Sequence, residues 1–380
     1  MATTRSRLPA LLALATAAFT TVLTEALPAG VLPEMSRGLS AGESATGQLV
    51  TAYAVGTALT AIPLSLVTAR WRRRVLLLSG VSGFAVANTV TALSESYWLT
   101  LAARFGAGIA AGVVWALLAG YARRLVPEPL AGKAIAIVMT GIPLALSLGV
   151  PAGTALGEAV GWRWTFGVMS VLAAVLSAWI ALAVPDFPGL PSGGPPPLRA
   201  TLAMPGVRWT LFVTLVFVLA HNTLFTYIAS LLDYHGLSDA KDLALLLFGI
   251  ASVVGTAVVG ALIDRASRPL LFACTVLVAL AALALAALPV PLVAITVWGL
   301  AWGGVPTLLQ TAAAVAAGPY ADPAQAALVT LWNVAIAAGG VAGGVLLSQA
   351  GPTAPAYTAA VLLLFLAAVG RRNREPAPSR

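Results

Sequence analysis

The sequence predicts an all-α integral membrane protein, with twelve transmembrane helices arranged as two pseudo-symmetric six-helix bundles. The first observation is composition, because 59% of the 380 residues are hydrophobic and only 9% are charged, with a mean hydropathy of +0.94. A soluble domain of this length cannot carry so much apolar surface in water, so the chain belongs in a lipid bilayer. The second observation is one long stretch rich in Pro and Gly, which divides the apolar runs into two halves.

A helix that crosses a bilayer needs about 20 mostly apolar residues, and twelve such runs occur between polar residues. The spans are Pro9 to Leu32, Gly47 to Val67, Val75 to Leu93, Tyr97 to Tyr121, Lys133 to Val160, Thr165 to Val184, Val207 to Leu232, Leu243 to Ile263, Leu270 to Leu288, Leu292 to Ala317, Gln325 to Gln349 and Tyr357 to Gly370. Arg5 and Arg7 before the first span also resemble the start of a secretory signal. Its apolar run continues past Phe19, which is too long for a signal core, so we expect it to be the first helix.

The segment between the sixth and seventh spans, PDFPGLPSGGPPPLRATLAMPG, is predicted to be non-helical because Pro and Gly break helices. It separates an N-terminal six-helix bundle, residues 1–184, from a C-terminal six-helix bundle with a short basic tail, residues 207–380. Residues 185–206 are then a cytoplasmic interdomain linker. Parallel repeats of this kind place a binding site between the two halves, near the middle of the membrane.

Basic residues fall mainly on one side of the predicted membrane, and an excess of Lys and Arg marks the cytoplasmic side. Those on this side are Arg70, Arg72, Arg73, Arg74, Arg123, Arg124, Lys133, Arg199, Arg208, Arg265, Arg268 and the terminal arginines. The opposite side has only Arg37, Arg163 and Lys241. We therefore expect a multi-pass protein of the cytoplasmic membrane with both termini cytoplasmic, in which the net charge of +8 reflects topology and not nucleic-acid binding.

Two basic turns stand at equivalent places in the two halves. GALIDRASRPL, from Gly260 to Leu270, follows the eighth span and contains Asp264, Arg265 and Arg268. SLVTARWRRRVLLL follows the second span, and it has Ser65 and Ala69 where the later copy has its glycine and aspartate. The complete copy resembles the loop signature of the major facilitator superfamily, in which these residues tie two helices together at the cytoplasmic side.

Three further segments carry the same resemblance. RFGAGIAAG, which begins at Arg104, resembles the fourth-helix motif of the proton-coupled branches of the superfamily. GVPAGTALGEAVGWRWTF resembles the fifth-helix motif of drug and metabolite efflux antiporters, although Val150 separates Gly149 from Pro151. TEALPAGVLPEM is similar to the start of the arabinose-efflux-permease-like group. The resemblance covers the whole chain and implies a monomeric proton antiporter that works by alternating access.

The fifth span carries small residues four apart, at Gly141, Ala145, Gly149, Gly153 and Gly157, and these form a ridge along one helix face. A second ridge in the fourth span comprises Gly108, Gly112, Ala116 and Gly120. Plain helix packing explains such ridges, whereas the resemblance implies a gating role at the seam between the halves. The gating residues so implied are Gly149, Pro151, Gly153, Gly157, Arg70, Arg73, Gly260, Asp264, Arg265 and Arg268.

Glu25 is the one acidic residue predicted to lie deep in the membrane. At about 1.5 Å per residue it lies about 24 Å from the cytoplasmic start of the first helix, and Arg104 lies about 10 Å below the outer start of the fourth. Both therefore fall in the outer half of the membrane at similar depth. Two interpretations remain open: a static ion pair, or a proton-coupling carboxylate whose pKa Arg104 tunes.

Polar and aromatic residues within the spans are candidates for the wall of a substrate cavity. They are Tyr53, Trp115, His221, Asn222, Tyr227, Trp298, Trp302, Trp332 and Asn333. Each aromatic residue also suits packing or a lipid-facing position. His221 is a candidate proton relay or, alternatively, a histidine hydrogen-bonded inside the bundle.

The sequence contains no constellation that suits an enzyme. It has two histidines, a single cysteine at Cys274 and no phosphate loop of the GxxxxGK[ST] type, so we expect no catalytic residues, metal or cofactor. Without ATP hydrolysis, the energy must come from an ion gradient. We therefore predict a secondary transporter that exports a small organic molecule (drug, antibiotic, sugar or nucleoside) in exchange for protons. The alternative is an uncoupled facilitator or an uptake permease.

Overall fold

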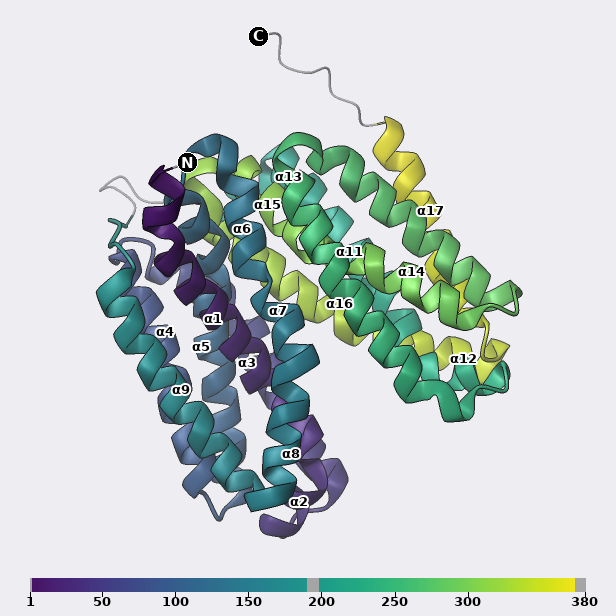
Figure 1. Ribbon diagram of the computed structural model, residues 1–380, viewed down its shortest axis with the longest axis horizontal. Coiled ribbons are helices and arrows are strands. Elements are labelled where there is room, and N and C mark those ends of the chain that lie inside the picture. The colour runs from purple at the N-terminus through teal and green to yellow at the C-terminus, as the bar shows by residue number, and fades with distance from the viewer. Residues whose placement is uncertain (1, 190–197, 373–380) are drawn as a thin grey trace. The chain divides into compact units, whose positions relative to one another are not determined.

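The computed structural model describes residues 2–189 and 198–372, and within these ranges all regular secondary structure is helical (Figure 1). The helices of the first half are α1 (Ala2–Gly30), α2 (Leu32–Gly38), α3 (Glu43–Val67), α4 (Arg73–Leu93), α5 (Tyr97–Arg124), α6 (Ala131–Met139), α7 (Gly141–Leu144), α8 (Val150–Val160) and α9 (Trp162–Ala183). The later helices are α10 (Leu198–Ala203), α11 (Pro205–Phe225), α12 (Ile228–Tyr234), α13 (Lys241–Ala287), α14 (Pro291–Gly303), α15 (Val305–Ala317), α16 (Ala321–Ala350) and α17 (Ala354–Arg372).

Ten helical stretches in the described residues are long and apolar enough to cross a membrane. Two of them, Ser238–Ala287 with 50 residues and Pro291–Ala350 with 60 residues, each contain two of the twelve predicted spans. At about 1.5 Å per residue both are longer than two crossings of a ~30 Å hydrocarbon core. The stretches therefore agree with the predicted all-helical membrane fold.

Local breaks interrupt two of the ten stretches. In α13 the backbone of Ala266 leaves the helical region, with φ −143° and ψ 32°, between the predicted eighth and ninth spans. The predicted fifth span is interrupted by a π-helical turn, Ala145–Gly149, which lies just before Pro151. A wider turn at this place is expected, because proline removes a backbone donor and its ring clashes with the preceding turn.

The prediction of a wholly non-helical linker is wrong for part of residues 185–206. Leu198–Ala203 forms the short helix α10, and Pro205 begins α11. The six residues of α10, LRATLA, contain neither Pro nor Gly, so nothing in them breaks a helix. Residues 190–197, which hold most of the Pro and Gly, lie outside the described residues.

The chain divides into two compact units. Unit 1 comprises residues 1–208 and 310–333, and unit 2 comprises residues 209–309 and 334–380. The two units do not coincide with the two predicted six-helix bundles, since residues 310–333 pack with unit 1. Consequently α15 and α16 each contribute one part to each unit.

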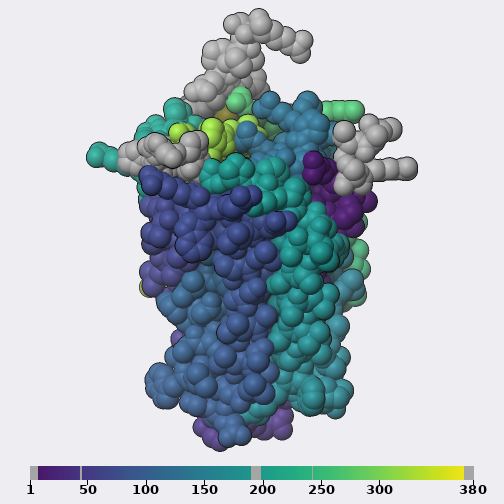
Figure 2. Space-filling model, turned by 90° about the vertical axis from the view of Figure 1, so that its left-hand side faces the viewer, coloured from purple at the N-terminus to yellow at the C-terminus, as the bar shows by residue number. Residues whose placement is uncertain are grey.

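The surface of unit 1 has the character expected of a protein in lipid. Figure 2 shows α4 and α9 side by side on one face of this unit. Their outward residues Val86, Val171, Val175 and Leu182 are each more than 60% exposed. Such exposure of large apolar side chains is unfavourable in water and favourable in a bilayer.

Candidate transport and gating sites

Arg104 on α5 is buried inside unit 1, with an exposed fraction of 0%. Its Nη2 donates a hydrogen bond to the carbonyl oxygen of Thr24 on α1, at 2.5 Å. The guanidinium lies over the rings of Tyr53 and Phe166, 5.2 and 5.9 Å from their centroids. Within the described part of the chain, Nε and Nη1 donate no hydrogen bond. The Arg104 cation thus lies in a low-dielectric interior, and two of its nitrogens form no hydrogen bond with the described residues.

Glu25 follows Thr24 on α1 and is half-buried. Its charge and that of Arg104 interact, yet the ion pairs within 4.0 Å among the described residues do not include these two side chains. The structure therefore brings Glu25 and Arg104 into one site without joining them in a closed ion pair.

Tyr53 and Asn88 complete this site. The Tyr53 hydroxyl donates to the carbonyl oxygen of Thr21 at 3.1 Å, so this predicted cavity residue is a buried neighbour of Arg104. Asn88 on α4 donates through Nδ2 to Thr24 Oγ1 at 3.3 Å, and its Oδ1 accepts no hydrogen bond from the described residues. Sequence reasoning missed Asn88, although an amide in the middle of an apolar span is the signal that identifies it.

His221 lies in an aromatic cluster within unit 2. Trp298 Nε1 donates to His221 Nδ1 at 3.1 Å, and the His221 ring stacks on Trp302 with centroids 3.4 Å apart and planes 1° apart. Phe225 stacks on His221 at 5.3 Å. Because an indole N–H only donates, Nδ1 must be an acceptor, and the neutral ring carries its hydrogen on Nε2. This is the tautomer of His221 that accepts the Trp298 hydrogen bond.

The other predicted cavity residues are distributed over both units. Asn222 Nδ2 donates to the carbonyl oxygen of Val218 at 2.9 Å, and the Tyr227 hydroxyl donates to that of Gly340 at 2.8 Å, both within unit 2. Trp115, Trp332 and Asn333 belong to unit 1. Within unit 2, His221, Trp298 and Trp302 of the predicted set form a direct side-chain cluster.

The glycine ridge of the fifth span packs against α1 inside unit 1. A Cβ atom at Gly149 would lie 2.8 Å from Phe19 Cζ, one at Gly153 would lie 2.5 Å from Leu27 Cδ1, and one at Gly157 would lie 2.6 Å from Val31 Cγ1. These distances are too short for a real methyl group. Pro151, in contrast, is exposed. The ridge therefore permits a close approach of the two helices, which larger side chains would prevent.

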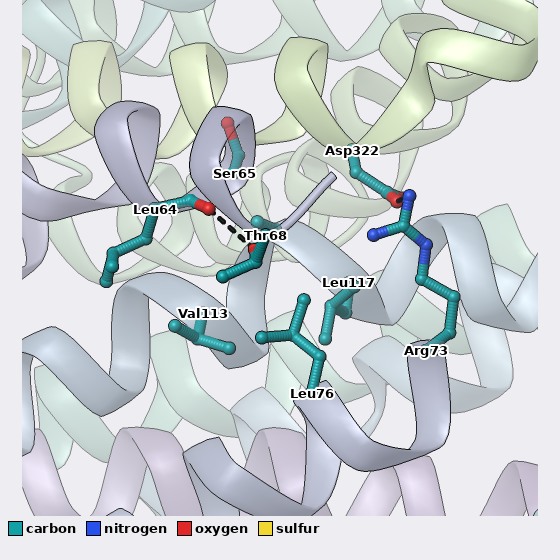
Figure 3. A pocket seen from close by; sticks show the side chains of 9 residues that line it. Leu64, Ser65, Thr68, Arg73, Leu76, Val113, Leu117 and Asp322 are labelled. Carbon is teal, nitrogen blue, oxygen red and sulfur yellow. Dashed lines mark hydrogen bonds and ion pairs between the residues drawn. The ribbon is translucent and has the colours of Figure 1, made fainter. Parts of the chain in front are cut away.

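The turn after α3 contains a buried ion pair. Arg73 Nη2 lies 2.9 Å from Asp322 Oδ2, and the side chains are 2% and 6% exposed (Figure 3). Arg73 also donates to the carbonyl oxygen of Ala69 at 3.0 Å. The cavity beside the pair measures about 10 Å³. Asp322 is a site residue that sequence reasoning placed only at a helix end, and its position at the start of a span opposite a basic turn was the available signal.

The rest of this turn fixes the beginning of the linker. Asp186 forms an ion pair with Arg72 and accepts a hydrogen bond from the backbone N–H of Arg74 at 3.1 Å. Desolvation raises the pKa of Asp186, but these hydrogen bonds and the two positive charges outweigh it, so the pKa lies below its usual range. Arg70 is exposed.

The second copy of the turn lies in unit 2, where α13 is kinked. Gly260 is half-buried, and Asp264, Arg265 and Arg268 are exposed around the non-helical Ala266. The two copies thus differ in environment as well as in sequence, since Arg73, which corresponds to Arg268, is buried.

Comparisons with known proteins identify the family of the chain. The chain is 30% identical over 361 residues to the purine ribonucleoside efflux pump NepI of Shigella dysenteriae, covering 91% of this chain and 89% of that protein. It is 27% identical over 355 residues to the "Probable sugar efflux transporter" of Mannheimia succiniciproducens, covering 92% of this chain and 89% of that protein.

Solved structures share the fold. The human organic anion transporter MFSD10 superposes with a TM-score of 0.77 at 18% identity, over 97% of this chain and 99% of that one. The Escherichia coli fucose:proton symporter FucP superposes with a TM-score of 0.75 at 16% identity, over 98% of this chain and 100% of that one. The family model of the Major Facilitator Superfamily matches residues 14–323. The chain therefore belongs to the major facilitator superfamily, and it is a multi-pass membrane transporter of small molecules and not an enzyme.

Proposed function

We propose that this transporter exports a small organic molecule in exchange for protons by alternating access, as a monomer with both termini in the cytoplasm. The observation that carries the proposal is the open arrangement of Glu25 and Arg104. A fully buried guanidinium with two unused nitrogens lies near a half-buried carboxyl group, without a closed ion pair. Placing ionisable side chains inside a membrane is energetically unfavourable, and such residues therefore indicate a functional site.

Protonation of Glu25 would control this pair. A neutral carboxyl group has little attraction for Arg104, whereas a carboxylate would be drawn to the unused Nη1 and Nε atoms. Because Thr24 on α1 already binds Arg104 on α5, closing the pair would change the contact between these two helices. Proton uptake and release at Glu25 would thereby be coupled to helix movement.

We further propose that the predicted cavity residues contribute to substrate binding. Two of the relatives are named a purine ribonucleoside efflux pump and a probable sugar efflux transporter. With one deep acid and many aromatic side chains, the chain suits a neutral or weakly cationic substrate. His221 serves this site as a neutral ring, since its Nδ1 accepts the Trp298 hydrogen bond.

For gating, we propose roles for the glycine ridge and the two basic turns. The ridge on α7 and α8 would let α1 slide or tilt at short range, because small residues leave the helix surfaces smooth. Pro151 and the π-helical turn before it would make this helix easier to bend. The turns at Arg70 to Arg73 and at Gly260 to Arg268 would restrain the ends of their helices.

The test is proton movement on addition of substrate to proteoliposomes, with candidate substrates drawn from nucleosides, sugars and antibiotics. We expect proton-driven accumulation by the unmodified protein, and loss of coupled exchange in Glu25→Gln with substrate binding retained. Glu158→Gln is the matched control, because Glu158 is an exposed acid near the end of α8. Equal proton exchange by both variants would remove Glu25 from the mechanism. Equilibration of substrate without proton movement in the unmodified protein would favour a facilitator.

A further inference from the structure

The imidazole of His221 on α11 has one polar edge that the protein does not use. Trp298 Nε1 donates to His221 Nδ1 at 3.1 Å, so the tautomer that accepts this bond carries its hydrogen on Nε2. Within the described part of the chain, Nε2–H donates to no other group. We infer that this N–H is the donor by which the transporter recognises its substrate, and that the substrate is a neutral planar heterocycle with a hydrogen-bond acceptor at its edge.

Stacking and a hydrogen bond together fix the orientation of the His221 ring. Its plane lies 1° from that of Trp302 with centroids 3.4 Å apart, and Phe225 stacks on it at 5.3 Å with planes 17° apart. A half-turn about the Cβ–Cγ bond would replace Nδ1 by a carbon atom and break the bond from Trp298, which is itself buried. The direction of Nε2–H is therefore set before a ligand arrives, and such preorganisation lowers the entropic cost of binding.

The Nε2 atom is accessible, although little of His221 is exposed. The residue is 5% exposed, and Nε2 is not one of the fully buried side-chain nitrogens that lack a hydrogen bond among the described residues. Nε and Nη1 of Arg104, in contrast, are fully buried. A ligand atom can therefore accept from His221 Nε2–H without displacing a hydrogen bond of the protein.

The surroundings of Nε2 favour a neutral, planar ligand. Phe225, Phe248, Trp298 and Trp302 surround the His221 ring, with centroids 3.4 to 6.2 Å away. Aromatic side chains pack well against another planar ring, and the single N–H requires an acceptor atom. Ion pairs and cation–π contacts among the described residues do not involve this cluster, so it offers a charged ligand no partner of opposite charge. A sugar would leave most of its hydroxyl groups without hydrogen bonds in this cluster.

This inference deepens the proposed function, on which it rests, because it names the substrate class that the predicted cavity residues of unit 2 would bind. It concerns contacts inside unit 2 alone. His221 would then determine specificity, since a fixed donor accepts one hydrogen-bond polarity and rejects the other.

Two probes of opposite hydrogen-bond polarity test the inference by equilibrium dialysis, with the full-length protein in detergent and no proton gradient. Caffeine is a neutral planar heterocycle that only accepts hydrogen bonds, whereas the N–H of indole only donates. We expect caffeine to bind, and His221→Phe, which keeps an aromatic ring in the stack, to weaken its binding about three- to tenfold. The affinity for indole should not fall. His235→Phe is the matched control, because His235 is the other histidine of the chain and its Nε2 lies 2.7 Å from the carbonyl oxygen of Leu285.

A magnetic-resonance measurement on the unmodified His221 keeps the test independent of how well His221→Phe folds. The chain has two histidines, so isotope-labelled histidine gives two sets of imidazole signals, and His235→Phe assigns them. We expect caffeine to shift the Nε2 and Nε2–H signals of His221. The Nδ1 signal should stay nearly unchanged, because Nδ1 keeps its hydrogen bond from Trp298.

Three results would overturn the inference: a caffeine-induced shift at Nδ1 in place of Nε2, an equal loss of caffeine and indole affinity in His221→Phe, or no binding of caffeine to the unmodified protein. Proton-coupled export of a sugar without caffeine binding would overturn it too and leave the proposed function standing. Caffeine binding at His221 in a protein that moves no protons with any candidate substrate would overturn the proposed function and leave the recognition role of His221 standing.

Discussion

Arg104 on α5 donates a hydrogen bond to the backbone carbonyl of Thr24, the residue that precedes Glu25 on α1. This bond ties the buried cation to the backbone of α1 and leaves its interaction with the Glu25 side chain free to change. A side-chain ion pair alone would break completely whenever Glu25 took up a proton. Because a carbonyl oxygen does not titrate near neutral pH, we expect this backbone hydrogen bond not to depend directly on the protonation state of Glu25.

Arg104→Ala should impair transport more than Arg104→Lys. The alanine variant leaves Glu25 without a cation, whereas lysine keeps the charge but loses the planar fork that reaches Thr24 and lies over Tyr53. We expect export to be abolished in the first variant and reduced in the second, measured as substrate-driven proton flux in proteoliposomes. Equal activity of the alanine variant and the unmodified protein would show that Arg104 is dispensable.

Gly153→Leu should lower transport sharply while the protein still inserts into the membrane. Its new side chain would collide with Leu27 on α1, which a Cβ atom alone would approach to 2.5 Å. Gly167→Leu provides the control, because a Cβ atom at Gly167 on α9 meets nothing within 4 Å. Export assays at matched membrane levels compare the two. If both variants transport normally, the ridge does not need its glycines for function.

Trp298→Phe should destabilise the protein by about 1–3 kcal/mol, because His221 Nδ1 would stay buried without its hydrogen-bond donor. Thermal unfolding in detergent measures the change. In a double-mutant cycle with His221→Phe, which keeps a ring in the stack on Trp302, we expect the two costs to be less than additive. Strict additivity would mean that the Trp298 to His221 hydrogen bond contributes nothing to stability.

Asp186 should stabilise the protein in a pH-dependent way. Its pKa is below the usual range in the folded protein, so its contribution is present above the unfolded value of about 3.9 and is lost as pH falls through the folded pKa. Asp186→Asn should therefore be less stable than the unmodified protein near pH 7, and the difference should shrink below about pH 4. Unfolding measured at a series of pH values tests this prediction. A stability difference between the two proteins that grows as the pH falls would contradict it.

Reporter fusions test the predicted topology. After Arg380, we expect activity from a reporter that functions only in the cytoplasm. Near Ser94, we expect activity from a reporter that functions only outside the cytoplasm. We expect this orientation because the arginine-rich loops lie on the same predicted side of the membrane as the two termini. The reverse pattern would overturn the orientation.

The sequence by itself determined that the chain is a membrane protein and where its spans lie. Lipid requires a continuous apolar run in each span, and this property is local, so it can be read residue by residue. The same locality explains why Glu25 and Arg104 stood out, because charges are rare in such runs. The family followed from short motifs at Arg104, Gly149 and Gly260, whose spacing is also local.

Only the tertiary structure decided which residues meet. No periodicity in the sequence links Arg73 to Asp322, shows that Trp298 fixes the tautomer of His221, or selects α1 as the partner of the glycine ridge. Nor could a boundary between two compact units be found inside α16, because the helix itself is continuous there. These features depend on packing between segments far apart in the chain, and in a membrane every span has a similar apolar surface, so composition alone cannot specify its neighbour.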